Sequence, residues 1–438
     1  MRQRLPLFIR HTVYNLRGGF LIRPLLIALT LGSSGAFLSL VEEHHPQLSS
    51  WLPAALFPSR SDPQVAQMVL GDIATSIMTV VSIIFAILLM TLTLASMQFS
   101  PRIISSFVKD KVTQWALGLF LGTFAYCIAA LPAARTLPHP FSPILTTFGA
   151  MILALICIGW LLFFIHHISQ AISVSHIVDK VAVETNRVVA QTMPEPYLGG
   201  ELGITQVHEL DAGATPIASE RSGYIRYIDL NHLREHANHA KVKLRVLRKV
   251  GYFVPKGVPL LLVSKVEKLT DHQRRELLSA FDLGPSRTLQ QDIEFGILQI
   301  VDIALRAISP AVNDPTTAIN CIDQLSGILI QVAGRKAPST VLYDPPSIPR
   351  ILVSWPTFGE LLESAFGQIR HYSQSDVAVS LRLLRGLIDI ATAVERPDIR
   401  HHLLVLGTQV VEGCAPHMAA NDLNRVQDRW SDLEKRCK

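Results

Sequence analysis

Long apolar segments alternate with short polar segments over residues 1–168. Four apolar segments, residues 25–41, 73–97, 115–131 and 144–168, carry no Asp, Glu, Lys or Arg. A helix needs about 20 predominantly apolar residues to cross a bilayer, and shorter or longer segments are accommodated by bilayer thinning or helix tilt. The pattern therefore predicts that residues 1–168 form a transmembrane domain of four helices.

The pattern changes after residue 168. Residues 169–206 are typical of a connecting helix and a linker, and residues 207–266 show short apolar alternations between glycines, which predict a β module. From residue 270 to residue 438, apolar positions recur at helical spacing, which predicts an α-helical domain. The expected helices span residues 271–281, 290–308, 315–332, 358–372, 376–394, 398–414 and 423–436, and a short strand is expected at 350–353.

The second apolar segment carries hydroxyl side chains along one face. At about 100° per residue, a narrow stripe on this helix contains Thr75, Thr79, Ser82, Thr93 and Ser96. Such a stripe lets another helix approach closely, with Ser and Thr bonding across the contact or to their own backbone. Alternatively, it faces water and lines a path for an ion or a small solute. The sequence allows both interpretations.

The third apolar segment contains Gly118 and Gly122 at a spacing that permits tight helix packing. The centres of the four segments hold no ionisable Asp, Glu, Lys or Arg, which proton pumps and many ion-coupled carriers require. Four such helices make a small bundle. We therefore expect the hydroxyl stripe and the two glycines to face other copies of the chain in a homo-oligomer.

The net charge of +5 belongs entirely to the apolar half. Residues 1–168 contain 10 Lys and Arg against 5 Asp and Glu, whereas the remaining residues contain 30 of each kind. The neutral polar half argues against a nucleic-acid partner. The basic residues lie before the first segment, between the second and third, and after the fourth, so the positive-inside rule predicts cytoplasmic N- and C-termini.

Catalytic motifs are not evident. The sequence lacks GxSxG, HExxH and a phosphate-binding glycine loop, and we expect no enzyme and no cofactor. The five cysteines form no CxxC pair, so neither a disulfide framework nor a zinc ribbon is expected. Buried or unused thiols in a reducing compartment are the favoured interpretation.

One polar stretch lies between two expected helices and contains Arg306, Ser309, Asn313, Asp314 and Thr316. The helix amides near Thr316, with Arg306 close by, could bind an anion or another small ligand. The alternative is a capped turn, because Asp314 followed by Pro315 is typical of a helix start. The capped turn is the favoured interpretation.

Three histidines, His232, His236 and His239, share one face of a short expected helix. This spacing suits metal ligands, but no second ligand set lies nearby in the sequence apart from Asp229 and Glu235. A solvated helix face is the favoured interpretation, and we expect no metal site.

Two resemblances add to this picture. The run VGYFVPKGVPLLLV resembles the turn-and-strand repeat of lipoyl-type barrel-sandwich modules, without an identifiable carrier lysine. The stretches 95–127, which contains QFSPR, and 287–318, which contains SP-x-x-NDP-x-TA, resemble the predicted bacterial membrane proteins called domain of unknown function 2254. That resemblance implies several N-terminal membrane helices and a cytoplasmic C-terminal part in the inner membrane, with no established activity.

The expected fold class is therefore an integral membrane α-helical protein. A four-helix transmembrane bundle precedes a small cytoplasmic β barrel-sandwich-like module and a cytoplasmic α-helical domain. The function that this sequence favours is a homo-oligomeric channel, with a passive pore lined by the second helix and gated by the cytoplasmic region. The alternative is a membrane-anchored sensor or scaffold, whose cytoplasmic module binds a ligand or partner without transport.

Overall fold

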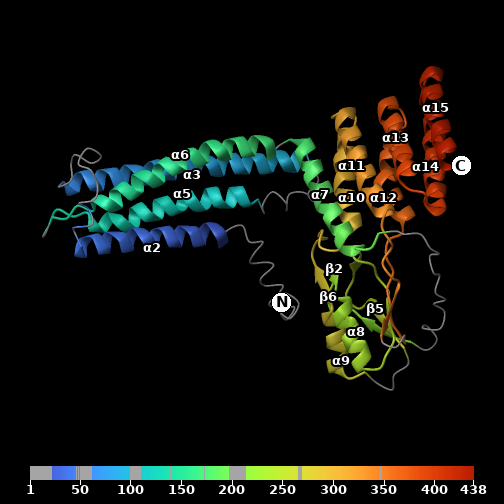
Figure 1. Cartoon of the computed structure of the whole chain (residues 1–438), viewed down its shortest axis with the longest axis horizontal. Coiled ribbons are helices and arrows are strands. Elements are labelled where there is room, and N and C mark those ends of the chain that lie inside the picture. The colour runs from blue at the N-terminus through green and yellow to red at the C-terminus, as the bar shows by residue number, and fades with distance from the viewer. Residues whose placement is uncertain are drawn as a thin grey trace. The chain divides into compact units, whose positions relative to one another are not determined.

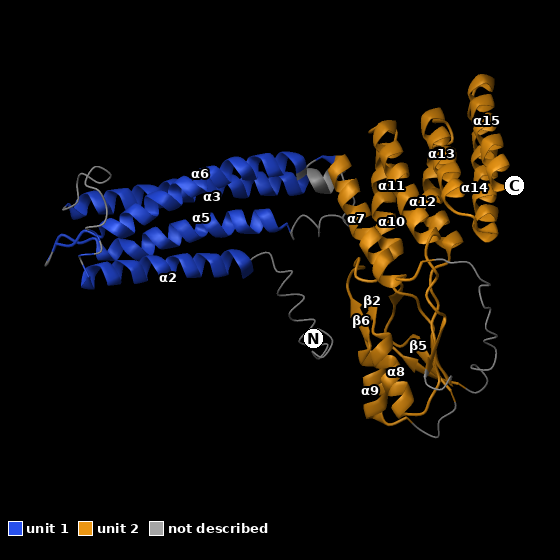
Figure 2. Cartoon of the chain, viewed as in Figure 1, with its two compact units in different colours: residues 1–173 blue, residues 174–438 orange. Residues whose placement is uncertain are grey.

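The computed structural model describes residues 22–45, 47, 49, 62–98, 110–137, 140–171, 173–196, 214–264, 269–344 and 348–438, and their side chains except those of residues 94–98, 171 and 344. The chain divides into two compact units, residues 1–173 and 174–438, which Figure 2 shows in blue and orange.

Unit 1 is a bundle of long helices (Figure 1): α2 (Ile22–His44), α3 (Pro63–Gln98), α5 (Lys111–Ala130), the 3-10 turn η2 (Leu131–Ala133) and α6 (Ile144–Ala171). Among the described residues, four helices are long and apolar enough to cross a membrane, as the sequence predicts. Helix α3 begins earlier than expected, because Pro63 suits the first helical position and Asp62 accepts a hydrogen bond from the amide of Gln64 at 2.9 Å.

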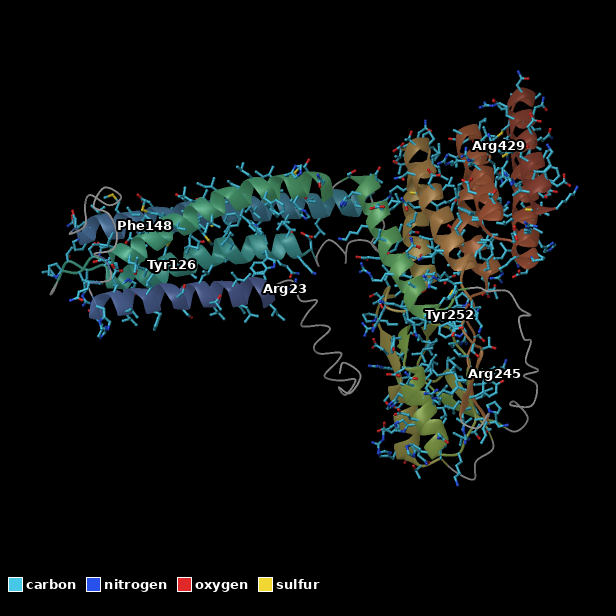
Figure 3. The ribbon with its side chains drawn as sticks, viewed as in Figure 1. Arg23, Tyr126, Phe148, Arg245, Tyr252 and Arg429 are labelled. Atoms are coloured by element: carbon cyan, nitrogen blue, oxygen red, sulfur yellow. The ribbon has the colours of Figure 1, made fainter. Side chains whose placement is uncertain are left out.

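The interior of this bundle is filled by apolar side chains. Ile77 and Ile84 of α3 pack in one cluster with Phe120 of α5 and Phe164 of α6, and all four are buried. Nearer the other end, Tyr126 of α5 (labelled in Figure 3) is buried and its hydroxyl donates to the carbonyl of Thr146 at 3.0 Å. The described part of a single bundle thus has a packed core.

Glycines bring α2 and α5 together. A Cβ added to Gly118 would lie 2.7 Å from Cδ1 of Ile27, and one added to Gly122 would lie 2.5 Å from Cδ1 of Leu31. On the other side of the contact, a Cβ on Gly35 would lie 2.6 Å from the carbonyl oxygen of Tyr126. Gly118 and Gly122 therefore serve close packing within one chain, and the expectation that they face a second copy is wrong for them.

Unit 2 contains the remaining elements (Figure 1): α7 (Val174–Thr192), β1 (Thr215–Ala218), β2 (Gly223–Ile228), α8 (Leu230–His239), β3 (Leu244–Val246), β4 (Phe253–Val254), β5 (Pro259–Val263), α9 (Asp271–Ser279), β6 (Phe281–Gly284), α10 (Ile293–Ala307), α11 (Pro315–Ala333), β7 (Val341–Asp344), β8 (Ile348–Leu352), α12 (Phe358–Tyr372), α13 (Val377–Ala393), α14 (Pro397–Cys414) and α15 (Ala420–Cys437). Every helix expected after residue 270 is present, with bounds shifted by a few residues. Capping boxes fix the starts of α9 and α12, where Thr270 pairs with Gln273 and Thr357 with Glu360.

The β region is larger than residues 207–266. One sheet has the order β1-β5-β3-β8-β7 and the other β4-β2-β6, so strands from residues 281–284 and 341–352 complete both sheets. Strand β8 lies parallel to β3, with Leu244 opposite Ile351. Both sheets contribute to one core, which also includes Leu233 of α8 and Leu277 of α9. Pairing between strands so distant in sequence is not visible in local patterns.

Candidate functional site

The hydroxyl face of α3, defined by Thr75, Thr79, Ser82 and Thr93, lies on the outside of the bundle. These side chains are exposed, whereas Ile77 and Ile84 on the opposite side of α3 are buried. The side chain of Ser96, the fifth predicted residue, lies outside the described residues. The helical periodicity therefore separates a packed apolar side from an exposed hydroxyl side.

Each hydroxyl on this face bonds to its own helix. The Oγ1 of Thr75 donates to the carbonyl of Gly71 at 2.9 Å, and Oγ1 of Thr79 donates to the carbonyl of Thr75 at 3.0 Å. Ser82 and Thr93 make the same bond one turn back, to Met78 and Leu89. A hydroxyl that donates its proton still has acceptor lone pairs. The face can thus lie in an apolar environment at low cost and still accept hydrogen bonds from water or coordinate a cation.

A groove between α3 and α5 runs along the part of this face that contains Thr75, Thr79 and Ser82. Its volume is about 420 Å³, and it is lined by Gly71, Ala74, Thr75, Met78, Thr79, Ser82, Phe124 and Ile128. The groove is open at Gly71, where an added Cβ would meet no atom within 4 Å. One wall is therefore hydroxyl-bearing and the other is apolar.

The second predicted site lies in the turn between α10 and α11. Asp314 is the N-cap of α11 and accepts from the amide of Thr317 at 3.1 Å and from its hydroxyl at 2.5 Å. Hydrogen bonds from the Thr317 side chain, and then from its backbone, hold the pKa of Asp314 below its ordinary value. The Ser309 hydroxyl donates to the carbonyl of Arg306, and Asn313 has a left-handed backbone with φ 49°. A carboxylate already occupies this helix end, as in the capped-turn interpretation, and ligand binding here stays a prediction.

A charged network at the start of α10 was not foreseen. Arg287 donates to both carboxylate oxygens of Asp292, at 2.8 and 2.9 Å, and to Glu294 at 2.8 Å. Asp292 also caps α10 by accepting from the amide of Phe295 at 2.9 Å, and its side chain is only 3% exposed. The sequence signal was present, since an Asp directly before an apolar helical run is typical of an N-cap.

A polar cavity of about 530 Å³ lies beside this network, lined by Lys249, Val250, Tyr252, Glu294, Pro356, Thr357, Gly359, Glu360, Glu363, Ser364 and His402. The Nζ of Lys249 lies 2.8 Å from both carboxylate oxygens of Glu360. Burial alone would raise the pKa of Glu360, but hydrogen bonds from Lys249 and Thr357 lower it. The cavity therefore presents fixed charges of both signs.

Comparisons with known proteins agree with the presence of membrane-spanning helices. Residues 17–389 match the family model described as predicted membrane protein, DUF2254. The chain belongs to the DUF2254 family. It is 32% identical over 381 residues to the uncharacterised proteins Rv1290c of Mycobacterium tuberculosis and Mb1321c of Mycobacterium bovis, covering 85% of this chain and 72% of each relative. No solved structure matches the chain significantly.

The DUF2254 match includes all four candidate spans, and its end lies within α13. The stretch 287–318, which carries part of the resemblance in sequence, builds both the Arg287 network and the Asp314 turn. The other stretch, 95–127, contains QFSPR, which lies largely outside the described residues. The membrane assignment is therefore established for this family member, and its chemistry is not given by its relatives.

The thiols of this DUF2254 protein are free and mostly buried, as the sequence predicts. Cys127, Cys157, Cys321 and Cys414 are buried, and Cys437 is partly exposed. In unit 2, burial raises the pKa of the Cys321 thiol to about 12. Such a thiol is not a nucleophile at neutral pH.

Of the three histidines predicted on one face, the structure separates His239 from His232 and His236. His232 and His236 lie against α9, where Glu276 approaches both rings, whereas His239 is exposed. Glu276 is not predicted from the sequence, because it lies 44 residues beyond His232 and no local spacing connects them.

Proposed function

We propose that this DUF2254 protein is a homo-oligomeric membrane channel with a passive pore lined by the hydroxyl face of α3. The observation that supports it is the exposure of Thr75, Thr79 and Ser82 along an open groove on the outside of an otherwise apolar bundle. Acceptor oxygens in a row on a membrane helix are suited to solvating an ion or a small polar solute. In the described part of a single bundle, the space between the helices is filled by Ile84, Phe120 and Phe164. The conduction path therefore lies between copies.

The proposal places unit 2 in the cytoplasm, as the distribution of Lys and Arg favours. Helix α6 ends at Ala171 and α7 begins at Val174, so the last span continues almost directly into unit 2. Helix α7 packs against α10 and α11 within that unit. A rearrangement of the helical domain would therefore act on α6 through a very short connection, which suits a gate.

A second candidate function is a membrane-anchored sensor or scaffold. It is favoured by the polar cavity of about 530 Å³, in which Lys249, Glu294 and His402 could recognise a charged ligand. In that function, the hydroxyl face of α3 serves only assembly or packing.

Ion flux from proteoliposomes distinguishes the two. We would compare the wild-type chain with Thr79→Leu, which removes a hydroxyl from the groove and fills it with an apolar side chain. The matched control is Thr30→Leu on α2, where an exposed threonine also donates to its own backbone, the carbonyl of Ile27 at 2.9 Å. The channel predicts a several-fold loss of flux in Thr79→Leu alone, with the oligomeric state unchanged.

Absence of flux in the wild-type protein under varied voltage, pH and osmotic stress would overturn the proposal that the protein is a channel. Equal flux in the two Thr→Leu variants would remove α3 from the pore. Insertion of Gly-Ser-Gly between Ser173 and Val174 tests gating separately, because a flexible insertion uncouples α6 from α7 while leaving both helices intact. A gated channel then responds less steeply to its stimulus at unchanged maximal flux.

A further inference from the structure

Two short helices of unit 2 hold a group of metal-ligand side chains in place. Helix α8 starts at the N-cap Asp229, which accepts from the amide of His232 at 3.1 Å. Helix α9 starts in the capping box of Thr270. The helices pack through Leu233 of α8 and Leu277 of α9, which are fully or almost fully buried in the core between the sheets. The backbone beneath the ligand side chains is therefore fixed.

Three side chains converge from these helices. The Nε2 atoms of His232 and His236 each lie 3.6 Å from Oε2 of Glu276. The two imidazole rings are one helical turn apart, with centroids separated by 4.3 Å, and one ligand atom from each of the three residues lies within 4.8 Å of the others. We propose that His232, His236 and Glu276 form a zinc-binding site on unit 2.

Two of the three distances between ligand atoms are close to what the ion requires. Zinc binds histidine nitrogen and carboxylate oxygen at about 2.0–2.2 Å in a tetrahedron, so neighbouring ligand atoms lie about 3.3–3.5 Å apart. The two measured distances of 3.6 Å exceed this range only slightly, and small rotations of the partly exposed side chains close the difference. Two histidines and one carboxylate leave the fourth position to water, a ligand set that zinc uses in proteins.

The surroundings of His236 also bear on its protonation. Burial lowers the pKa of His236, and the neighbouring His232 lowers it further, against the opposing effect of Glu276. A neutral imidazole is the form that binds a metal. His239 and Glu235 of α8 also act on His236 through their charges, and His272 of α9 lies 4.0 Å from the other oxygen of Glu276.

Hydrogen bonds already direct His232 toward α9. Its Nε2 lies 3.0 Å from Oγ of Ser279 and 3.2 Å from the carbonyl oxygen of Glu276. Binding zinc through Nε2 replaces these bonds and moves the ring proton to Nδ1. Each imidazole must be unprotonated at the nitrogen that binds zinc, so affinity falls as the pH is lowered.

The test uses the full-length, tag-free protein in detergent, stripped with a chelator and titrated with Zn²⁺ against a chromogenic competitor. We expect one ion per chain. In His236→Gln and in Glu276→Gln we expect the zinc affinity to fall about tenfold or more, because replacing even a residue that only hydrogen-bonds to a metal ligand costs about that much. The matched controls are His239→Gln and His272→Gln, which change the same surface without removing a proposed ligand. Circular dichroism of each variant checks the fold.

Stoichiometric zinc binding that survives both ligand variants overturns the site, and so does the absence of binding by the wild-type protein. X-ray absorption of the zinc-loaded wild-type protein keeps the proposal testable if a variant does not fold. Two imidazoles and additional oxygen ligands are expected, and thiolate or a single imidazole would contradict it. These readouts do not depend on ion flux, so failure of the zinc site and failure of the channel are distinguishable.

Discussion

The carboxylate of Glu42, near the end of α2, accepts hydrogen bonds from both the backbone amide and the hydroxyl of Thr146 at the start of α6, at 3.1 and 3.0 Å. It also accepts from the amide of Leu145 at 2.7 Å, and Glu42 is only 2% exposed. Helix N-terminal amides have no partner within their own helix. The Glu42 side chain of the first span therefore accepts hydrogen bonds from free backbone amides at the start of the fourth span.

We expect Glu42→Ala to lower the free energy of unfolding of unit 1 by about 2–3 kcal/mol, because charge-assisted hydrogen bonds are lost and buried amides are left without a partner. The matched control is Glu43→Ala, whose carboxylate pairs with the partly exposed Arg135. Exposed pairs contribute about 0–1 kcal/mol. Denaturant unfolding in detergent micelles measures both, and equal effects would contradict the capping role of Glu42.

The close contact between α2 and α5 predicts that two Gly→Ala variants differ in stability. Gly35→Ala should destabilise the bundle by about 1–3 kcal/mol, since the new methyl group would press against backbone atoms of Tyr126, which cannot move aside. Gly159→Ala on α6 is the control, because its Cβ would meet no atom within 4 Å. Helix propensity there favours Ala by up to about 1 kcal/mol. Thermal unfolding in micelles should therefore move in opposite directions for the two variants.

The Arg287 network predicts a large effect in unit 2. Arg287→Met removes one partner of a pair in which Asp292 is almost fully buried, and breaking such a pair costs about 3–5 kcal/mol. Arg425→Met is the control, because Arg425 and Asp422 are both well exposed, and such a pair contributes at most about 1 kcal/mol. Urea unfolding followed by circular dichroism distinguishes them. A loss below 1 kcal/mol for Arg287→Met would show that the network is dispensable.

Asp314 predicts a dependence of stability on pH. Its folded pKa lies below the unfolded value, so its contribution is fully present above the unfolded pKa and is lost as the pH falls through the folded pKa. Asp314→Ala should lower the unfolding free energy by about 1 kcal/mol at neutral pH. The difference from wild type should shrink below about pH 4, where the carboxylate of the unfolded state begins to be protonated while the native carboxylate is still ionised. Unfolding curves across this range test the sign, and a difference that grows on acidification would contradict it.

Sequence patterns predicted the parts of this fold that depend on neighbouring residues. The four spans and the helices after residue 270 follow from apolar periodicity and from the cap Asp314, which acts within one turn. The direction in which the hydroxyl face of α3 points, and the partner of Gly118, depend on packing between segments and were not decided by periodicity. The pairing of β3 with β8 and the approach of Glu276 to His232 join positions far apart in the chain. Such contacts carry no local signal.

The burial of the native thiols has a practical consequence. Four of the five cysteines are inaccessible to solvent in the folded chain, so a maleimide reagent should label the wild-type protein mainly at Cys437. With Cys437→Ser, single cysteines placed at Thr75, Thr79 or Ser82 could carry spectroscopic probes or thiol-specific blockers without replacing the native ones. Accessibility along α3 could then be scanned position by position in a native-like background.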